Sequence, residues 1–325
     1  MSSPARAQTA VENFYKGRTI EVVVGTTPGG SYDLYGRLIA RNLGKHIPGN
    51  PTVIVKNMPG AGHLRMTNWL YNVAPRDGTV LATASQSIAF EQALGSDGIQ
   101  YDAAKFNWIG RAAQSVEVTF TWHTSPTKNI EDARRRETVM GATGPTSPTV
   151  IYLKVLNVLA GAHFKIVTGF RGGPETELAM QRGEVEGGSK SWPAMRVENA
   201  DWLREKKVNL LVQYALERSP DLPDVPLLAD FGHDTNARAA LKFFTMGNAQ
   251  GRSFMAPPGV PAERVAALRQ AFLNTMRDPD LVALATARKI EFGPAASGEA
   301  VGRLVAETLT VAPETIAMAK KVRRD

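Results

Sequence analysis

One turn near the start of the chain has residue types suited to holding an anion. It spans residues 25–33 and reads Gly-Thr-Thr-Pro-Gly-Gly-Ser-Tyr-Asp. Free backbone amides and aligned peptide dipoles at a helix start attract negative charge, and glycines let a ligand approach the backbone closely. Similar junctions occur in proteins that bind nothing there, so a purely structural turn is the alternative. The candidate ligand residues are Thr26, Thr27, Gly29, Gly30 and Ser31.

The segments around this turn have the patterns of a strand and a helix. Residues 20–24 are mostly apolar, which indicates a buried strand, and apolar residues recur at helical spacing from Leu34 to Ile47. The order repeats with expected strands at 52–56 and 79–83. Alternating strands and helices favour a parallel sheet, in which ligands bind beyond the carboxyl ends of the strands. The residues that follow the third strand, Ser85, Gln86 and Ser87, therefore join the candidate site.

A second α/β block and a mainly helical end follow. Expected strands at 139–143 and 164–167 each run into a glycine-containing turn, and helices are expected at 262–276, 278–286 and 297–321. The pattern predicts two lobes with two crossings between them. We expect residues 10–118 and 246–325 to form lobe 1 and residues 119–245 to form lobe 2.

The sequence contains no catalytic or metal-binding motif. Its five histidines are far apart, and it has no cysteine, no phosphate-binding loop and no nucleophile elbow. This favours binding over catalysis, so we expect no enzyme, no metal and no cofactor. The net charge of +7 is scattered along the 325 residues rather than concentrated in a basic stripe, which argues against nucleic acid as a partner.

The N-terminus indicates export. Ala5-Arg6-Ala7 before Gln8 is similar to the small-residue end of a secretory signal, although the apolar segment that normally precedes it is missing. We expect a periplasmic protein whose signal peptide has been trimmed. A disordered cytoplasmic N-terminus is the alternative.

In combination, these motifs resemble the substrate-binding proteins of tripartite tricarboxylate transporters, the Bug-type extracytoplasmic receptors. The resemblance covers about residues 14–320 and departs from the family at Thr26-Thr27, at residues 144–148 and at residues 189–192, all in expected ligand loops. The segments that carry it are Tyr15-Lys16-Gly17-Arg18-Thr19-Ile20, Pro28-Gly29-Gly30-Ser31-Tyr32-Asp33, residues 53–62 and 75–79, Phe170-Arg171-Gly172-Gly173, residues 182–185 and 222–226, and Met255-Ala256-Pro257-Pro258-Gly259-Val260-Pro261.

The resemblance implies a two-lobed periplasmic binding protein fold, type II-like, with a mainly parallel sheet flanked by helices in each lobe. It implies a monomeric receptor that captures a small organic acid, a di- or aromatic carboxylate, in an interlobe cleft and delivers it to membrane permease subunits. A ligand-sensing receptor and a cleft enzyme are the alternatives. The second-lobe ligand residues would be Thr143, Thr146, Ser147, Phe170, Arg171, Gly172, Ser189 and Trp192.

The roles of individual second-lobe residues stay open at this point. Arg171 or Lys190 would pair with a second carboxylate, or remain solvated. Trp192 or Phe170 would stack on an aromatic acid, or pack in the core. The sequence does not identify the acid.

Overall fold

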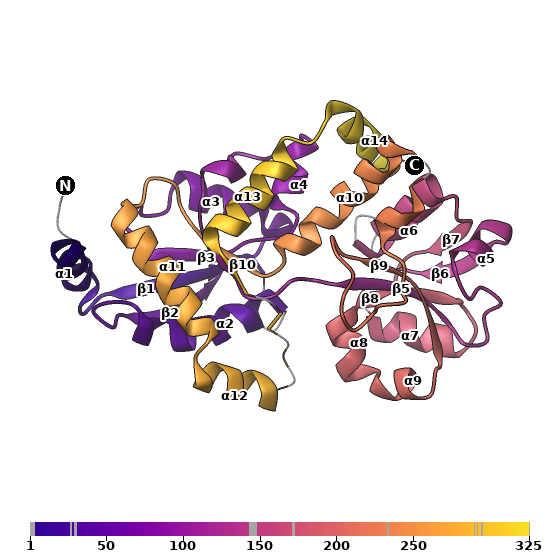
Figure 1. Ribbon diagram of the computed structural model, residues 1–325, viewed down its shortest axis with the longest axis horizontal. Coiled ribbons are helices and arrows are strands. Elements are labelled where there is room, and N and C mark those ends of the chain that lie inside the picture. The colour runs from indigo at the N-terminus through magenta and orange to yellow at the C-terminus, as the bar shows by residue number, and fades with distance from the viewer. Residues whose placement is uncertain are drawn as a thin grey trace. The chain divides into compact units, whose positions relative to one another are not determined.

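The chain folds into two compact units, each with its own sheet flanked by helices, as a computed structural model shows (Figure 1). The first unit is Met1–Gln114 with Gln250–Thr310, and the second is Ser115–Ala249 with Val311–Asp325. This two-lobed α/β architecture confirms the predicted fold class. The structure describes residues 4–26, 28, 31–142, 148–170, 173–232, 234–288, 290, 292–293 and 295–324.

The sheet of the first unit has six strands in the order β11-β4-β10-β3-β1-β2. β1 pairs in parallel with β2 and with β3, so the carboxyl ends of these three strands lie at one edge. Three consecutive valines of β1, residues 22–24, are buried, as expected for a strand covered on both faces. The strands are β1 (Thr19–Val24), β2 (Thr52–Asn57), β3 (Val80–Thr83), β4 (Asn107–Arg111), β10 (Ser253–Ala256) and β11 (Ala296–Ser297).

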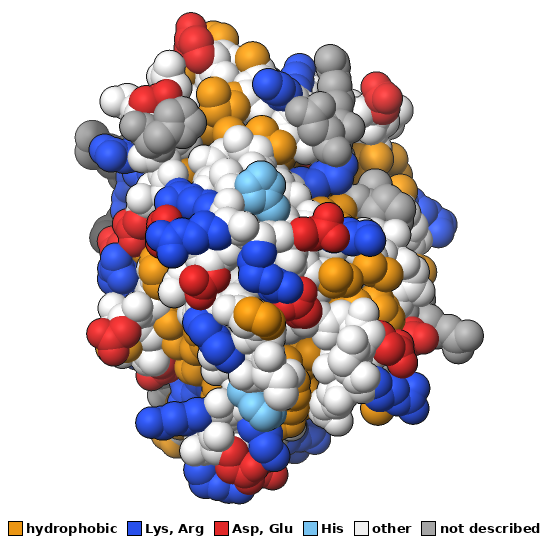
Figure 2. All heavy atoms as spheres, turned by 90° about the vertical axis from the view of Figure 1, so that its right-hand side faces the viewer, with side chains coloured by type: hydrophobic (Ala, Val, Ile, Leu, Met, Phe, Trp, Pro, Cys, Tyr) orange, Lys and Arg blue, Asp and Glu red, His pale blue; other side chains and the backbone are white. Residues whose placement is uncertain are grey.

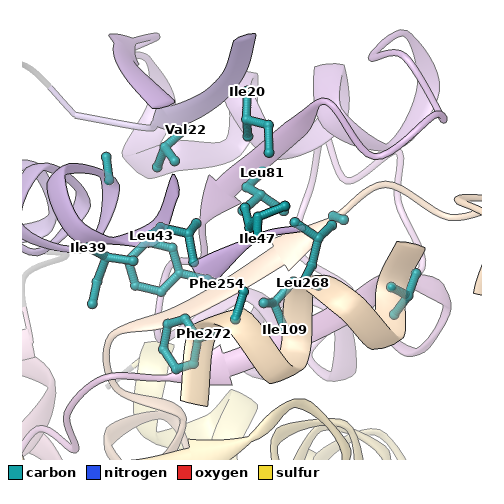
Figure 3. Packing of buried hydrophobic residues seen from close by; sticks show 14 of the residues in the cluster. Ile20, Val22, Ile39, Leu43, Ile47, Leu81, Ile109, Phe254, Leu268 and Phe272 are labelled. Carbon is teal, nitrogen blue, oxygen red and sulfur yellow. The ribbon is translucent and has the colours of Figure 1, made fainter. Parts of the chain in front are cut away.

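Helices of the first unit bury an apolar stripe against this sheet. Leu43 and Ile39 of α2 belong to one cluster with Phe254 of β10 and Phe272 of α11 (Figure 3). Full burial of such a side chain contributes roughly 1.5–3 kcal/mol. The helices are α1 (Pro4–Tyr15), α2 (Ser31–Leu43), α3 (Leu64–Asn72), α4 (Ile88–Ala93), α11 (Ala262–Met276), α12 (Pro279–Ala287) and α13 (Gly298–Leu309), with 3₁₀ turns η1 (Gly44–His46), η2 (Ala61–His63) and η3 (Ala103–Lys105).

The sheet of the second unit has five strands in the order β7-β6-β8-β5-β9. The strands are β5 (Glu117–Trp122), β6 (Thr138–Gly141), β7 (Phe164–Val167), β8 (Gly187–Ser191) and β9 (Val208–Tyr214). The helices are α5 (Ile130–Arg135), α6 (Pro148–Ala160), α7 (Gly173–Gln181), α8 (Trp192–Glu198), α9 (Ala200–Arg204), α10 (Thr235–Gln250) and α14 (Pro313–Arg324), with the 3₁₀ turn η4 (Leu228–Phe231).

In each sheet, the first strand after a change of unit runs antiparallel to its neighbours; in the first unit, β11 also pairs antiparallel with β4. β10 follows the change after Ala249 and lies antiparallel between β3 and β4. β5 follows the change after Gln114 and lies antiparallel between β8 and β9. In Figure 1 the orange β10 is seen among the indigo strands of the first unit. The first unit is therefore completed by a segment far away in sequence.

The C-terminal end differs from the sequence expectation. One helix over 297–321 was expected in lobe 1, but the chain forms two helices, and the second, α14, packs against α6 of the second unit. Pro313 explains the break, because proline has no N–H to donate and its ring clashes inside a helix, whereas it fits a first turn. The chain thus changes unit three times, after Gln114, Ala249 and Thr310, and not twice.

Charge is mixed on one face of the molecule. Figure 2 shows Lys and Arg side chains interspersed with Asp and Glu on the face that it displays. Among the described helices, none combines the length and the apolar character needed to span a membrane.

Candidate ligand-binding loops

The loop after β3 is held against the first turn of α2. The backbone N–H of Gln86 donates to the Tyr32 hydroxyl at 3.0 Å. The hydroxyls of Ser85 and Ser87 lie 2.9 Å apart, and Gln250 Nε2 donates to the Ser85 carbonyl at 3.2 Å. The predicted residues Ser85, Gln86 and Ser87 thus form one hydrogen-bonded loop beside α2 at the carboxyl edge of the sheet.

A network at the end of β2 holds the turn after β1. Asn57 Nδ2 donates at 2.9 Å both to the Thr26 carbonyl and to Asp33 Oδ1. Arg37 Nε donates to Asp33 Oδ2 at 2.8 Å. Asp33 is buried, and these bonds give it a structural role that ties β1, β2 and α2 together.

His63 is an unexpected member of this region. Its φ of 77° lies in the left-handed region that favours glycine. The imidazole is buried, its centroid lies 4.4 Å from that of the Tyr32 ring, and a Cβ atom on Gly25 would overlap it. Burial and the positive charge of Arg252 lower the pKa of His63 to about 4, so the ring is neutral at pH 7. Its Nδ1 has no hydrogen-bond partner among the described residues.

Arg252 brings a cation to the same place. Its carbon Cζ lies 4.5 Å from the centroid of the Tyr32 ring, and its Nη1 donates to Gln86 Oε1 at 2.9 Å. The backbone of Arg252 is fixed on both sides, since its N–H donates to the Ala113 carbonyl and its carbonyl accepts from the Ala112 N–H. No carboxylate of the described residues forms an ion pair with it.

Two further polar groups at the strand ends are unpartnered. Thr26 Oγ1 lies just beyond β1 and Thr83 Oγ1 at the last residue of β3, both buried without a hydrogen-bond partner among the described residues. A buried hydroxyl without a partner costs about 1–3 kcal/mol. Groups of this kind are expected where a ligand or water supplies the missing bond.

The second unit has a small pocket near the carboxyl ends of β6 and β8. Its volume is about 70 Å³, and its lining includes Gly141, Thr149, Thr176 and the predicted residue Ser189. Ser189 Oγ lies 2.7 Å from Thr119 Oγ1, which in turn lies 2.7 Å from the Tyr214 hydroxyl. This chain of hydroxyls fixes Ser189 at the pocket.

Lys190, also in the lining, already has its charge matched. Its Nζ lies 2.5 Å from Glu177 Oε1 and 2.8 Å from Glu198 Oε2, and it donates to Asn199 Oδ1 at 2.6 Å. Two carboxylates leave little attraction for a third, so the expectation of a solvated Lys190, or of one paired with the ligand, does not agree with these contacts.

The two aromatic candidates of the second unit pack with its core. Trp192 is 7% exposed and lies in one cluster with Val118 and Phe120, against which Phe170 packs as a partly buried side chain. Trp192 Nε1 is buried without a partner among the described residues. The core-packing alternative therefore describes Trp192 in this structure.

Several predicted residues lie outside the part of the chain that the structure describes. They are Thr27, Gly29, Gly30, Thr143, Thr146, Ser147, Arg171 and Gly172. Ser31 is the first residue of α2. Sequence reasoning missed His63 and Arg252. The usable signals were a histidine in a glycine turn and an arginine directly before the strand that returns to the first unit.

The described side chains do not assemble a metal site, since none of their His, Asp and Glu residues gather in groups of three or more. The chemistry that the described residues offer around Arg252 is that of hydrogen-bond donors, backbone amides and a cation without an ion-pair partner among them, which suits an anionic ligand.

Comparison with known proteins places the chain among solute receptors. Residues 36–318 match the family described as tripartite tricarboxylate transporter family receptor, TctC. The protein named UPF0065 protein in gbd 5'region, from Cupriavidus necator, is 28% identical over 286 residues, which are 85% of this chain and 79% of that protein.

Solved structures agree in fold. A TctC solute-binding protein from Polaromonas, without ligand, has a TM-score of 0.72 at 20% identity, covering 95% of this chain and 99% of its own. MatC from Rhodopseudomonas palustris with bound malate has a TM-score of 0.60 at 21% identity, covering 94% and 99%. Rpa4515 from Rhodopseudomonas palustris with adipate has a TM-score of 0.62 at 20% identity, covering 94% and 96%.

Proposed function

Because the chain belongs to the tripartite tricarboxylate transporter receptor family, and is thus a periplasmic solute-binding receptor rather than an enzyme, we propose that it captures a small organic carboxylate. We further propose that it delivers this acid to the membrane permease subunits of a tripartite tricarboxylate-type transporter. Monomeric action and removal of a signal peptide remain predictions.

The observation that carries the carboxylate proposal is the set of unpartnered polar groups at the carboxyl edge of the first sheet. Thr26 Oγ1, Thr83 Oγ1 and His63 Nδ1 are buried there without partners among the described residues. Polar groups in such positions favour a ligand that brings both donors and acceptors, or acceptors with bound water. A carboxylate supplies two acceptor oxygens to hydroxyl donors and to backbone amides at the start of α2.

The ligands of two structures with the same fold support this class. MatC holds malate and Rpa4515 holds adipate, and both ligands are dicarboxylates. We therefore place dicarboxylates first in the panel to be tested, ahead of monocarboxylic and aromatic acids.

A thermal-shift screen tests the proposal. The panel contains succinate, malate, glutarate, adipate, benzoate and acetate, each titrated against the protein. A ligand at 100 times its dissociation constant stabilises the folded state by about 2.7 kcal/mol, which raises the melting temperature measurably. If no acid raises it, the receptor proposal is contradicted; if an acid is consumed in the same sample, by NMR, the enzyme alternative gains.

Two substitutions test which loops bind. Ser31→Trp in the first unit and Thr146→Trp in the second add bulk at predicted ligand positions, and we expect each to weaken binding of the acid found in the screen. Unchanged affinity in both variants would remove the loop assignment while leaving the receptor function intact.

Delivery to a permease needs its own test. Proteoliposomes that contain the permease subunits should take up the labelled acid only when the receptor is added. Tight binding without receptor-dependent uptake would favour the ligand-sensing alternative instead.

A further inference from the structure

We infer that Arg252 pairs directly with a carboxylate of the ligand and so determines the charge selectivity of the first unit. The inference rests on the proposed function, and it adds a residue that is distant in sequence from every glycine turn of the predicted site. Arg252 lies directly before β10, the strand that returns to the first unit after the change of unit at Ala249.

Backbone and side-chain contacts fix the position of Arg252. Backbone hydrogen bonds to Ala112 and Ala113 fix its main chain. Gly251, at φ +52°, allows the approach, because a Cβ atom there would overlap the Ala113 carbonyl. The guanidinium is then oriented by the Tyr32 ring below it and by Gln86 Oε1 at its edge. Contacts from the segment after β4, from α2 and from the loop after β3 thus position the guanidinium at the start of α2.

Most N–H groups of this guanidinium have no hydrogen-bond partner in the part of the chain that the structure describes. Arginine has five N–H donors, and the structure assigns one side-chain bond, from Nη1 to Gln86. Its charge is not matched by any described carboxylate, in contrast to Lys190, which is bonded to two. A carboxylate fits the planar fork of arginine with two parallel hydrogen bonds.

The neighbouring groups suit an anion and not a second cation. His63 is kept neutral by burial and by Arg252 itself, so it adds no competing charge. The buried His63 ring packs against the Tyr32 ring, so the surroundings of the guanidinium are partly apolar. A charge-assisted hydrogen bond in such surroundings is stronger than in water.

The test compares variants in a binding titration with the acid that gives the largest thermal shift in the panel. Arg252→Gln removes the charge, and Arg252→Lys keeps the charge but loses the fork. We expect Arg252→Gln to bind about 10- to 100-fold more weakly, as for loss of a hydrogen bond to a charged group, and Arg252→Lys to fall between. Arg41→Gln, an exposed residue in the last turn of α2, removes the same charge from the same unit and should bind as the unchanged protein does.

A second readout separates direct pairing from a merely structural role. A carboxylate bound at Arg252 offsets the field of the guanidinium on His63, so saturation with the acid should raise the pKa of the His63 ring in the unsubstituted protein, followed by NMR. This measurement needs no variant to fold.

The outcomes are distinct. Weaker binding by Arg252→Gln, with the melting temperature of the free protein preserved, together with the rise for His63, supports the inference. Equal binding by Arg252→Gln, or a His63 titration unchanged by saturating acid, overturns it while the receptor function stands. Failure of every acid to bind the unsubstituted protein contradicts the proposed function itself.

Discussion

At the scale of residues, the first unit gathers four side chains with complementary properties: Tyr32, His63, Gln86 and Arg252. The tyrosine ring is in contact with the His63 imidazole and with the Arg252 guanidinium, and its hydroxyl accepts from the backbone of Gln86. The group places a neutral base and an uncompensated cation together at the start of α2. Its members come from four separate parts of the sequence.

Gly25 and His63 lie in close contact, so substitutions at the two positions should have coupled effects on stability. Gly25→Ala should destabilise the protein, because the added methyl group overlaps the His63 ring. In a His63→Gly background the same change should be tolerated, since the ring is gone and glycine accepts a φ of 77°. The coupling free energy from chemical unfolding of the four proteins should be about 1–3 kcal/mol. Additive effects would show that the contact does not form.

The second prediction concerns the protonation of His63. With a pKa of about 4 in the folded state against about 6.5 unfolded, the ring stays neutral until the pH approaches 4. The unfolded state then binds more protons, so the stability that the neutral ring contributes is fully present above pH 6.5 and is lost as the pH falls toward 4, by up to about 3 kcal/mol. His63→Asn, which tolerates the left-handed conformation, should flatten this pH dependence.

The control for this titration is His123→Asn, which replaces an exposed histidine. That variant should keep the pH dependence of the unsubstituted protein. In addition, Arg252→Gln should raise the pKa of His63, because it removes a positive charge. A His63 ring that titrates near 6.5 by NMR would contradict the burial seen here.

At the scale of elements, Asp278 joins the start of α12 to η1, the 3₁₀ turn that follows α2. Its Oδ1 accepts from the Asp280 N–H at 2.9 Å as a helix N-cap, and its Oδ2 lies 2.8 Å from Lys45 Nζ and 2.5 Å from His46 Nε2. Burial opposes ionisation of this carboxyl, but these bonds outweigh it and lower its pKa to about 2. The side chain is therefore an ionised link between α12 and η1.

Asp278→Ala should cost about 1–3 kcal/mol of unfolding free energy, from the lost cap and the lost charged hydrogen bonds. The contribution of the lowered pKa is present above about pH 3.8 and is lost as the pH falls toward 2, so the variant and the unsubstituted protein should converge in acid. Asp280→Ala, at an exposed carboxylate of the same helix, is the control and should change stability little.

Element positions with clear periodicity follow from sequence, whereas glycine-rich strands do not. The helix at 262–276 and the strand at 164–167 have the bounds expected from their apolar spacing. β8 begins with Gly187-Gly188, which reads as a turn by composition, yet the structure uses it as a strand. A side chain at Gly187 would overlap the Phe120 carbonyl of β5, so close approach of the two strands requires glycine there.

Gly187→Ala should accordingly destabilise the second unit by 2 kcal/mol or more, on the order expected for a forced backbone shift. Gly173→Ala is the matched control, because its added methyl group would meet only the end of the flexible Glu177 side chain. Thermal unfolding of both variants gives the comparison. Equal melting temperatures would mean that β5 and β8 have room to separate.

At the scale of the whole molecule, the two-unit organisation and the family can be predicted from the sequence. Two of the four side chains grouped in the first unit, His63 and Arg252, cannot. The turns at 25–33 and 85–87 could be placed at one sheet edge because consecutive parallel strands end there. Arg252 could not, because its position depends on β10 inserting between β3 and β4 from more than 140 residues away in sequence. His63 was hidden because glycine turns are not expected to hold a buried imidazole. The final crossing was missed because Pro313 was read as part of one helix.

Isothermal titration of the purified protein with the dicarboxylates of the panel measures carboxylate binding without an intermediate step. We expect saturable binding of at least one of them with one site per chain, weakened about 10-fold or more by Arg252→Gln and unaffected by Arg41→Gln. Titrations that show no saturable binding of any carboxylate would contradict the proposed function.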